Sequence, residues 1–114
     1  MVSHVVLFRP KADLTPEQHE AFFKALEHAL AGVPTIKRAT FGRRLILGRN
    51  YDAMAPADYQ YTAVLDFDDE AALRTYLDHP AHDALGAMFY KFGAAMAAFD
   101  YEMADAGDVR SLLR

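Results

Sequence analysis

The sequence predicts a single α+β domain, in which two helices pack on one face of a four-stranded antiparallel sheet. With 114 residues, of which 53% are hydrophobic, the chain has the size and apolar content of one folded domain. Four segments carry strand patterns and two carry helical spacing, in the order strand, helix, strand, strand, helix, strand. Helix caps, glycines and prolines mark most of the boundaries between them.

The first strand is predicted at residues 1–10. Residues 2–8 form a short run of mainly apolar, partly β-branched residues that ends at Arg9-Pro10. Because the run is apolar on both faces, we expect a central strand with neighbours on both sides. Strand alternation places His4 on the same face as Val6 and Phe8.

The first helix is predicted to begin at Thr15-Pro16 and to end at Gly32. Thr15 suits the N-cap, Pro16 suits the first helical position, and the amide of Gln18 can return to the cap, which makes a capping box. Apolar residues then recur at spacings of three and four. Gly32, which precedes Pro34, is expected to stop the helix in a left-handed conformation.

The middle of the chain predicts two further strands. Residues 35–47 lack a helical stripe and indicate a long, partly exposed strand, and residues 48–58 have the composition of a loop. Residues 59–67 alternate, with Tyr61 on the same face as Leu65 and Phe67.

A second helix, a break and a last strand complete the domain. The acidic residues 68–70 suit a helix N-terminus, and Pro80 interrupts the helix before it resumes over residues 81–96. Residues 98–103 alternate strictly and predict the final strand. We expect three of its side chains to face a core: Phe99, Tyr101 and Met103.

This order of elements is the βαββαβ, or ferredoxin-like, arrangement. Both helices would cover one face of the sheet, while apolar residues point in both directions. We therefore expect a homodimer whose two open faces close into a dimeric α/β barrel, with a cavity between the subunits. The domain is assigned to residues 1–103, and residues 104–114 are assigned to a C-terminal tail.

Composition excludes several classes of protein. A formal net charge of −4 argues against a nucleic-acid partner, because domains that bind phosphates usually carry a basic face. The absence of cysteine excludes disulfides and thiolate metal sites. No apolar run reaches the roughly 18 residues that span a bilayer, so no membrane segment is expected. No cationic and apolar leader opens the chain, and we expect a cytoplasmic protein.

The segment His79-Pro80-Ala81-His82 is the sharpest local signal. His82 lies in the first turn of a helix, where the positive end of the helix dipole lowers an imidazole pKa and favours a neutral base. His79 is expected to cap the end of the preceding helix. The HxxH spacing could also hold a metal, but neither a carboxylate nor a third histidine is placed nearby in the sequence, so no metal is expected.

His4 and two tyrosines leave two interpretations open. His4 is either a hydrogen-bonded core histidine or, if its face lines a cavity, a base or ligand contact. Tyr76 and Tyr61 could orient a substrate carbonyl near a neutral imidazole, or pack with their hydroxyls at the rim. His19 and His28, on the first helix, are interpreted as surface or edge residues.

The sequence resembles the stress-responsive A/B barrel (Dabb) family over residues 2–103. The resemblance is carried by the opening Met1-Val2-Ser3-His4-Val5-Val6-Leu7-Phe8, by the helix entry at residues 15–23 and by the third strand ending in Phe67. It continues through Tyr76-Leu77-Asp78-His79-Pro80-Ala81-His82 and Phe99-Asp100-Tyr101.

This resemblance implies a ferredoxin-like protomer in a dimer whose sheets close a barrel. One plant branch of the family closes an aromatic ring by cofactor-free aldol chemistry. Its active-site histidine and tyrosine match His82 and Tyr76, and its opening-strand histidine matches His4. A further strand histidine of that branch is Tyr61 in this sequence.

Our leading hypothesis is a protein that binds a small apolar or phenolic molecule in a cavity. The expected contacts are His4, Tyr61, Tyr76, His79, His82 and Phe89. If the protein is an enzyme, His82 is the general base and Tyr76 the orienting donor in proton transfer without a cofactor. Two alternatives stay open: a stress-related structural or interaction protein with a filled barrel, and a cofactor-free monooxygenase of a related barrel family.

Overall fold

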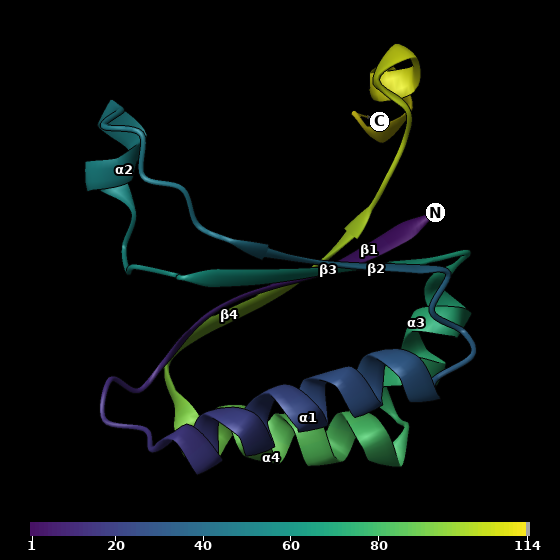
Figure 1. The fold of residues 1–114 in the computed structure, drawn as a ribbon. Helices are drawn as coiled ribbons and strands as arrows, with labels where there is room; N and C mark the ends of the chain where they lie inside the picture. The colour runs from purple at the N-terminus through teal and green to yellow at the C-terminus, as the bar shows by residue number, and fades with distance from the viewer. Residues whose placement is uncertain (114) are drawn as a thin grey trace.

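A computed structural model describes residues 1–113 and shows a sheet with helices packed on one side (Figure 1). The strands of the sheet are β1 (Val2–Pro10), β2 (Arg38–Arg43), β3 (Tyr61–Phe67) and β4 (Gly93–Glu102). The helices below it are α1 (Pro16–Gly32), α3 (Glu70–Leu77) and α4 (Pro80–Phe92). A short helix α2 (Asn50–Met54) and a 3₁₀ helix η1 (Ala106–Leu112) complete the chain. The predicted ferredoxin-like α+β fold is confirmed.

The four strands are ordered β2-β3-β1-β4, and every neighbouring pair is antiparallel. β1 therefore lies inside the sheet, as its apolar pattern on both faces predicts. The register of β1 with its two neighbours is given by Val5, which pairs with Val64 of β3 and with Phe99 of β4.

The core lies between the sheet and the helices and is rich in aromatic rings. Phe8 of β1 and Phe22 of α1 both meet Phe89 of α4 edge-on, with ring centroids 5.0 and 5.1 Å apart. Edge-on contacts of this kind suit the quadrupoles of aromatic rings and add to the gain from burying apolar area. The face of β1 that carries Val6 and Phe8 and the face of β3 that carries Leu65 are turned inward, since all three residues are buried.

The capping box of α1 is present, and the helix ends at Gly32 as predicted, but without the left-handed conformation expected there. The backbone N–H of Gln18 donates to the Thr15 hydroxyl, and the Thr15 N–H donates to the Gln18 side chain. The C-cap is Val33, whose backbone is extended. Among the described residues a positive φ occurs only at Gly48.

The predicted break at Pro80 is confirmed, but the role of His79 is different. His79 is the N-cap of α4: its Nδ1 accepts the backbone N–H of Ala81 at 3.0 Å. Because Pro80 occupies the first helical position, the residue before it lies where a side chain reaches the free amides of the new helix. His79 therefore does not cap the end of α3, where Asp78 is the C-cap.

Several predicted boundaries of strands and helices differ from those in the structure. The second strand spans residues 38–43 rather than 35–47, and α2 occupies part of the predicted loop. The helix predicted to reach residue 96 ends at Phe92, and β4 begins at once at Gly93. Residues 93–98 are mostly alanine, a good helix former, but pairing with β1 determines their structure.

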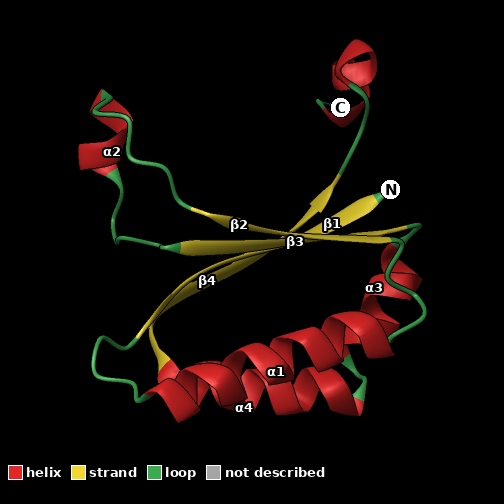
Figure 2. Ribbon diagram, in the orientation of Figure 1, coloured by secondary structure: helices red, strands yellow, loops and turns green. Residues whose placement is uncertain are grey.

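The face of the sheet away from α1, α3 and α4 is uncovered, and the predicted orientation of β4 is wrong. Phe99 and Tyr101 are each 49% exposed, and their partners Val5 and Ser3 place them on this open face. Met103 follows β4 and is also exposed. Figure 2 shows that α2 and η1 both rise on the same side as the open face. In the described part of the chain, none of the helices combines the length and apolarity needed to cross a bilayer.

Candidate active site

Three side chains that carry acid–base chemistry meet at one end of the core, each from a different element. His4 points to the helix side of β1 because it alternates in phase with Val6 and Phe8. Tyr76 lies in the last turn of α3, and His82 lies in the first turn of α4. The break at Pro80 is what brings these two turns together.

The three rings are in mutual contact. The centroids of Tyr76 and His82 are 4.9 Å apart, and those of His4 and Tyr76 are 5.9 Å apart. His4 and His82 are separated by 6.4 Å between centroids. Each pair meets edge-on. The structure thus brings together three of the six residues that the sequence proposed for the site.

A side-chain contact with Asp100 holds the ring of His4 in place, and the sequence did not predict this contact. Nδ1 of His4 lies 2.5 Å from Oδ1 of Asp100, which pairs with His4 across β1 and β4. An ionised carboxylate only accepts hydrogen bonds, so Nδ1 carries a proton. His4 is only 6% exposed, and this contact satisfies its polar edge. The alternation of residues 98–103 was a usable signal, because it separates Asp100 from Phe99 and Tyr101.

The surroundings shift the proton affinities of His82 and Tyr76 in opposite directions. Burial, and then the neighbouring His4, lower the pKa of His82 below its usual 6.5. A backbone hydrogen bond with Leu77, together with Asp83 and Asp78, opposes this shift. Burial raises the pKa of Tyr76 to about 12. At neutral pH the pair therefore consists of a neutral imidazole and a protonated phenol.

The pKa of His82 is lowered, as expected, but by burial and by His4 rather than by the helix dipole, and the predicted location of the cluster is wrong. His4, Tyr76 and His82 lie between the sheet and the helices of one chain, rather than on the open face between two sheets. The difference arises because β1 is apolar on both faces, so alternation could not say which face the helices cover.

The strand β4, which lies at the edge of the sheet, is partly uncovered on its helix side. His82 is half-buried, and the helix-facing residues Met96, Ala98 and Asp100 are exposed because α4 does not cover β4 completely. A cavity of about 390 Å³ lies between α4 and β4 and includes Phe89 and Met96. A second, of about 410 Å³, reaches Asp100. Neither of these two cavities is lined by a residue of the cluster, and of its three side chains only that of His82 is partly exposed.

Tyr61, Phe89 and His79 are not part of the cluster. Tyr61 and Phe89 contact Phe8, at 5.5 and 5.0 Å between centroids, and Val6 separates Phe8 from His4 on the same face of β1. His79 uses its Nδ1 as the cap of α4. Within residues 1–113, no group of three His, Cys, Asp or Glu side chains is arranged to hold a metal ion.

Sequence comparison assigns this chain to a known family. The sequence model of the "Stress responsive A/B Barrel Domain" family, Dabb, matches residues 2–103. The chain belongs to this family. The match includes all four strands and the helices that carry Tyr76 and His82.

Three relatives show the range of this A/B barrel domain. It is 24% identical, over 100 residues, to olivetolic acid cyclase of Cannabis sativa, covering 88% of this chain and 94% of the cyclase. A dimeric ferredoxin-like protein of unknown function from Thermobifida fusca is 32% identical, with a TM-score of 0.68 and 90% of each chain covered. Hydroxynitrile lyase from Passiflora edulis has the same fold at 17% identity, with a TM-score of 0.74, covering 92% of this chain and 94% of the lyase.

Proposed function

We propose that this A/B barrel domain binds a small apolar or phenolic carbonyl compound beside His4, Tyr76 and His82 and catalyses proton transfer on it without a cofactor. The observation that carries the proposal is the contact between Tyr76 and His82, 4.9 Å between centroids, with their proton affinities shifted apart. A neutral base beside a protonated donor is the pairing that general acid–base catalysis requires.

The chemistry that suits this pair is enolisation followed by bond formation. His82 takes a proton from the carbon next to a carbonyl group, while the Tyr76 O–H donates to the carbonyl oxygen, where negative charge builds. The enolate attacks a second carbonyl carbon of the same molecule and leaves an alkoxide. Protonated His82 then returns its proton to the alkoxide, so the step balances without an oxidant or reductant.

The relatives favour a cyclase- or lyase-like reaction of this kind. The cyclase from Cannabis sativa aligns with 88% of the chain, and the plant lyase shares the fold. Phe89 and Met96, which line the cavity between α4 and β4, suit an apolar or aromatic part of a substrate. The nearby imidazole of His4, held by Asp100, lowers the proton affinity of His82 and helps to keep it neutral.

Two assays test the proposal with a matched control. Ring closure of a linear poly-β-ketone and cyanide release from mandelonitrile are measured for the wild type, His82→Ala and His28→Ala. His28 is an exposed histidine on α1. His82→Ala should lower the rate by about 10²–10⁴-fold, and His28→Ala should leave it unchanged. Equal rates for wild type and His82→Ala would reject the assignment of the base.

A ligand screen tests binding separately from catalysis. A compound that binds only the folded protein, at 100 times its dissociation constant, stabilises the fold by about 2.7 kcal/mol. We expect a phenolic or polyketide-like compound to raise the melting temperature of the wild type. The absence of such a shift across both classes, with no turnover, would favour the non-catalytic structural alternative.

We further propose that the protein is a homodimer that uses the open face of its sheet. Val5, Val64 and Phe99 form a cross-strand row on this face, and none of the helices within residues 1–113 covers this row. The Thermobifida fusca relative is described as dimeric. A second copy would remove this apolar row from water, which stabilises the pair.

A further inference from the structure

The segment between β2 and β3, residues 44–60, is an arm that extends past the sheet. Figure 1 shows that it rises on the side of the open face, opposite α1 and α4. Its large apolar side chains are 65–79% exposed: Leu45, Ile46, Leu47, Tyr51 and Met54. Single exposed apolar residues are common on protein surfaces, but five within one short arm form a patch that suits a partner.

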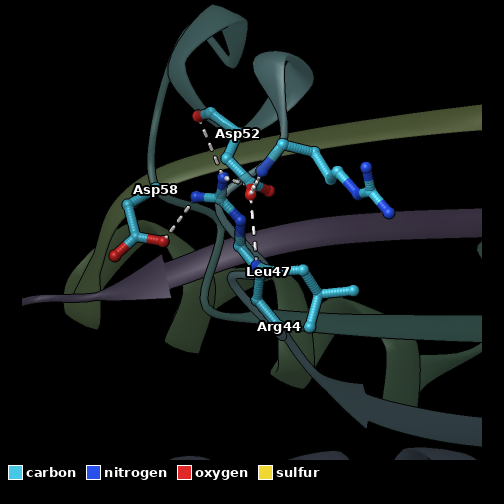
Figure 3. A network of polar contacts seen from close by, with 5 residues as sticks. Arg44, Leu47, Asp52 and Asp58 are labelled. Carbon is cyan, nitrogen blue, oxygen red and sulfur yellow. Dashed lines mark hydrogen bonds and ion pairs between the residues drawn. The ribbon is translucent and has the colours of Figure 1, made fainter.

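A polar network fixes the shape of the arm (Figure 3). Arg44 precedes the arm helix, and its Nη1 donates to Oδ1 of Asp58, which follows that helix, at 2.8 Å. Nη2 of Arg44 donates to the backbone carbonyl of Asp52 at 3.2 Å. The Asp52 carboxylate accepts the backbone N–H groups of Leu47 and Arg49. One arginine thus braces the arm at its end and in its middle.

The charges of this network are turned inward, while the apolar side chains are turned outward. The side chains of Arg44 and Asp52 are only 21% and 12% exposed. This is the reverse of the usual surface pattern, in which charged groups face water. A surface that is already fixed in shape loses less entropy when it binds, so the brace favours association.

The arm is continuous with the open face. A cavity of about 280 Å³ joins them, lined by Ala55 and Ala57 of the arm and by Leu7 and Thr62 of the sheet. A second copy that covers the open face therefore meets the apolar side of the arm as well. The exposed surface of the arm is mainly apolar, with Arg49 as an exposed charge between Leu47 and Tyr51, and it suits an apolar partner surface such as the same face of another copy.

We propose that the arm is a pre-shaped clamp that binds a second copy of this chain, and that Arg44 is the residue that holds the clamp in place. The inference rests on the proposed homodimer and adds the part of the chain that secures it. The clamp adds interface area to the open face and fixes how far along the sheet the partner lies.

The absence of cysteine allows a direct test by thiol labelling. Met54→Cys places one thiol on the arm, and Ala84→Cys places one on the exposed side of α4 as the control. At concentrations where the protein is dimeric, labelling of Met54→Cys should slow at least tenfold relative to dilute monomer, while Ala84→Cys should not change. Equal labelling of Met54→Cys in dimer and monomer would overturn the clamp. A protein that stays monomeric at every concentration would instead overturn the proposed homodimer.

A second experiment tests the brace. Arg44→Ala should weaken dimerisation at least tenfold in sedimentation equilibrium, with an unchanged far-UV spectrum. Arg74→Ala is the control, because it removes an exposed pair with Glu70 on the helix side. If Arg44→Ala fails to fold, Asp58→Asn weakens the same brace at a half-exposed position and should show the same direction. Folded variants of both that dimerise like the wild type would overturn the role of Arg44.

Discussion

His82 and Tyr76 hold their protons with different strength because they meet different surroundings. Tyr76 is almost fully buried, so its charged form is costly and the phenol stays protonated up to a pKa of about 12. His82 is half-buried beside His4, so the neutral imidazole is favoured. Two titratable groups whose affinities are pushed apart by their surroundings are a common feature of acid–base sites.

The pKa of His82 predicts how activity depends on pH. If His82 is the base, kcat/KM should rise with pH through a midpoint below 6.5 and stay level across neutral pH, because Tyr76 remains protonated. NMR titration of the His82 ring, assigned with His82→Gln, measures the same midpoint without substrate. A midpoint above 6.5 would contradict the sheltered position of this ring.

The same shift predicts the sign of the pH dependence of stability. Folded His82 binds a proton less readily than unfolded His82, so the unfolded state binds more protons between the unfolded pKa near 6.5 and the lower folded pKa. The contribution of His82 to the free energy of unfolding is complete above pH 6.5. It decreases as the pH falls from 6.5 to the lower pKa of the folded state. Urea denaturation at several pH values should show a smaller acid loss for His82→Gln than for the wild type.

Asp100 should contribute to stability through His4. Asp100→Ala leaves a buried imidazole N–H without a partner, and we expect the free energy of unfolding to fall by about 1–2 kcal/mol. Asp100→Asn keeps an acceptor oxygen and should lose less. Chemical denaturation of the three proteins at pH 7 measures the difference, and equal stability would show that water replaces the carboxylate.

At the level of helices and strands, the correct predictions came from sequence patterns that involve only a few neighbouring residues. Thr15, Pro16 and Gln18 define the start of α1 through contacts between neighbours in the chain. Pro80 likewise defines the start of α4. The start of β4 was missed because residues 93–98 favour a helix locally, and only their ladder with β1 makes them a strand.

The capping box provides a test at the scale of one element. Thr15→Ala removes the side-chain acceptor of the Gln18 N–H and should lower the free energy of unfolding by about 1 kcal/mol. Thr75→Ala is the matched control, because Thr75 lies within α3, exposed, and bonds only to the carbonyl of Ala71. Alanine is the better helix former there, so this control should be neutral or slightly stabilising.

At the scale of the molecule, the two faces of the sheet differ in what they carry. The helix side holds the core and the candidate site, while we propose that the open side and the arm bind a second copy. This division differs from the expectation of a site between two sheets. It implies that each copy carries a complete His4–Tyr76–His82 cluster, since all three residues come from one chain.

A charge on the open face should separate the copies without unfolding them. Phe99→Glu places a carboxylate in the row with Val5 and Val64, where a second copy would have to bury it. Tyr90→Glu, on the exposed side of α4, is the control and should keep the wild-type mass. Light scattering after size-exclusion chromatography measures the mass, and a dimeric Phe99→Glu would place the interface elsewhere.

The order of the elements, the division of β1 and β3 into two faces, and the place of His82 at the start of a helix follow from the sequence alone. These features depend on caps, prolines and alternation, which act between residues close in the chain. The tertiary structure decided which face of β4 is turned inward, and that His4 meets Asp100 across 96 positions of sequence. A period of two defines two faces of a strand but not which one is covered, so only the packing of the whole chain could choose.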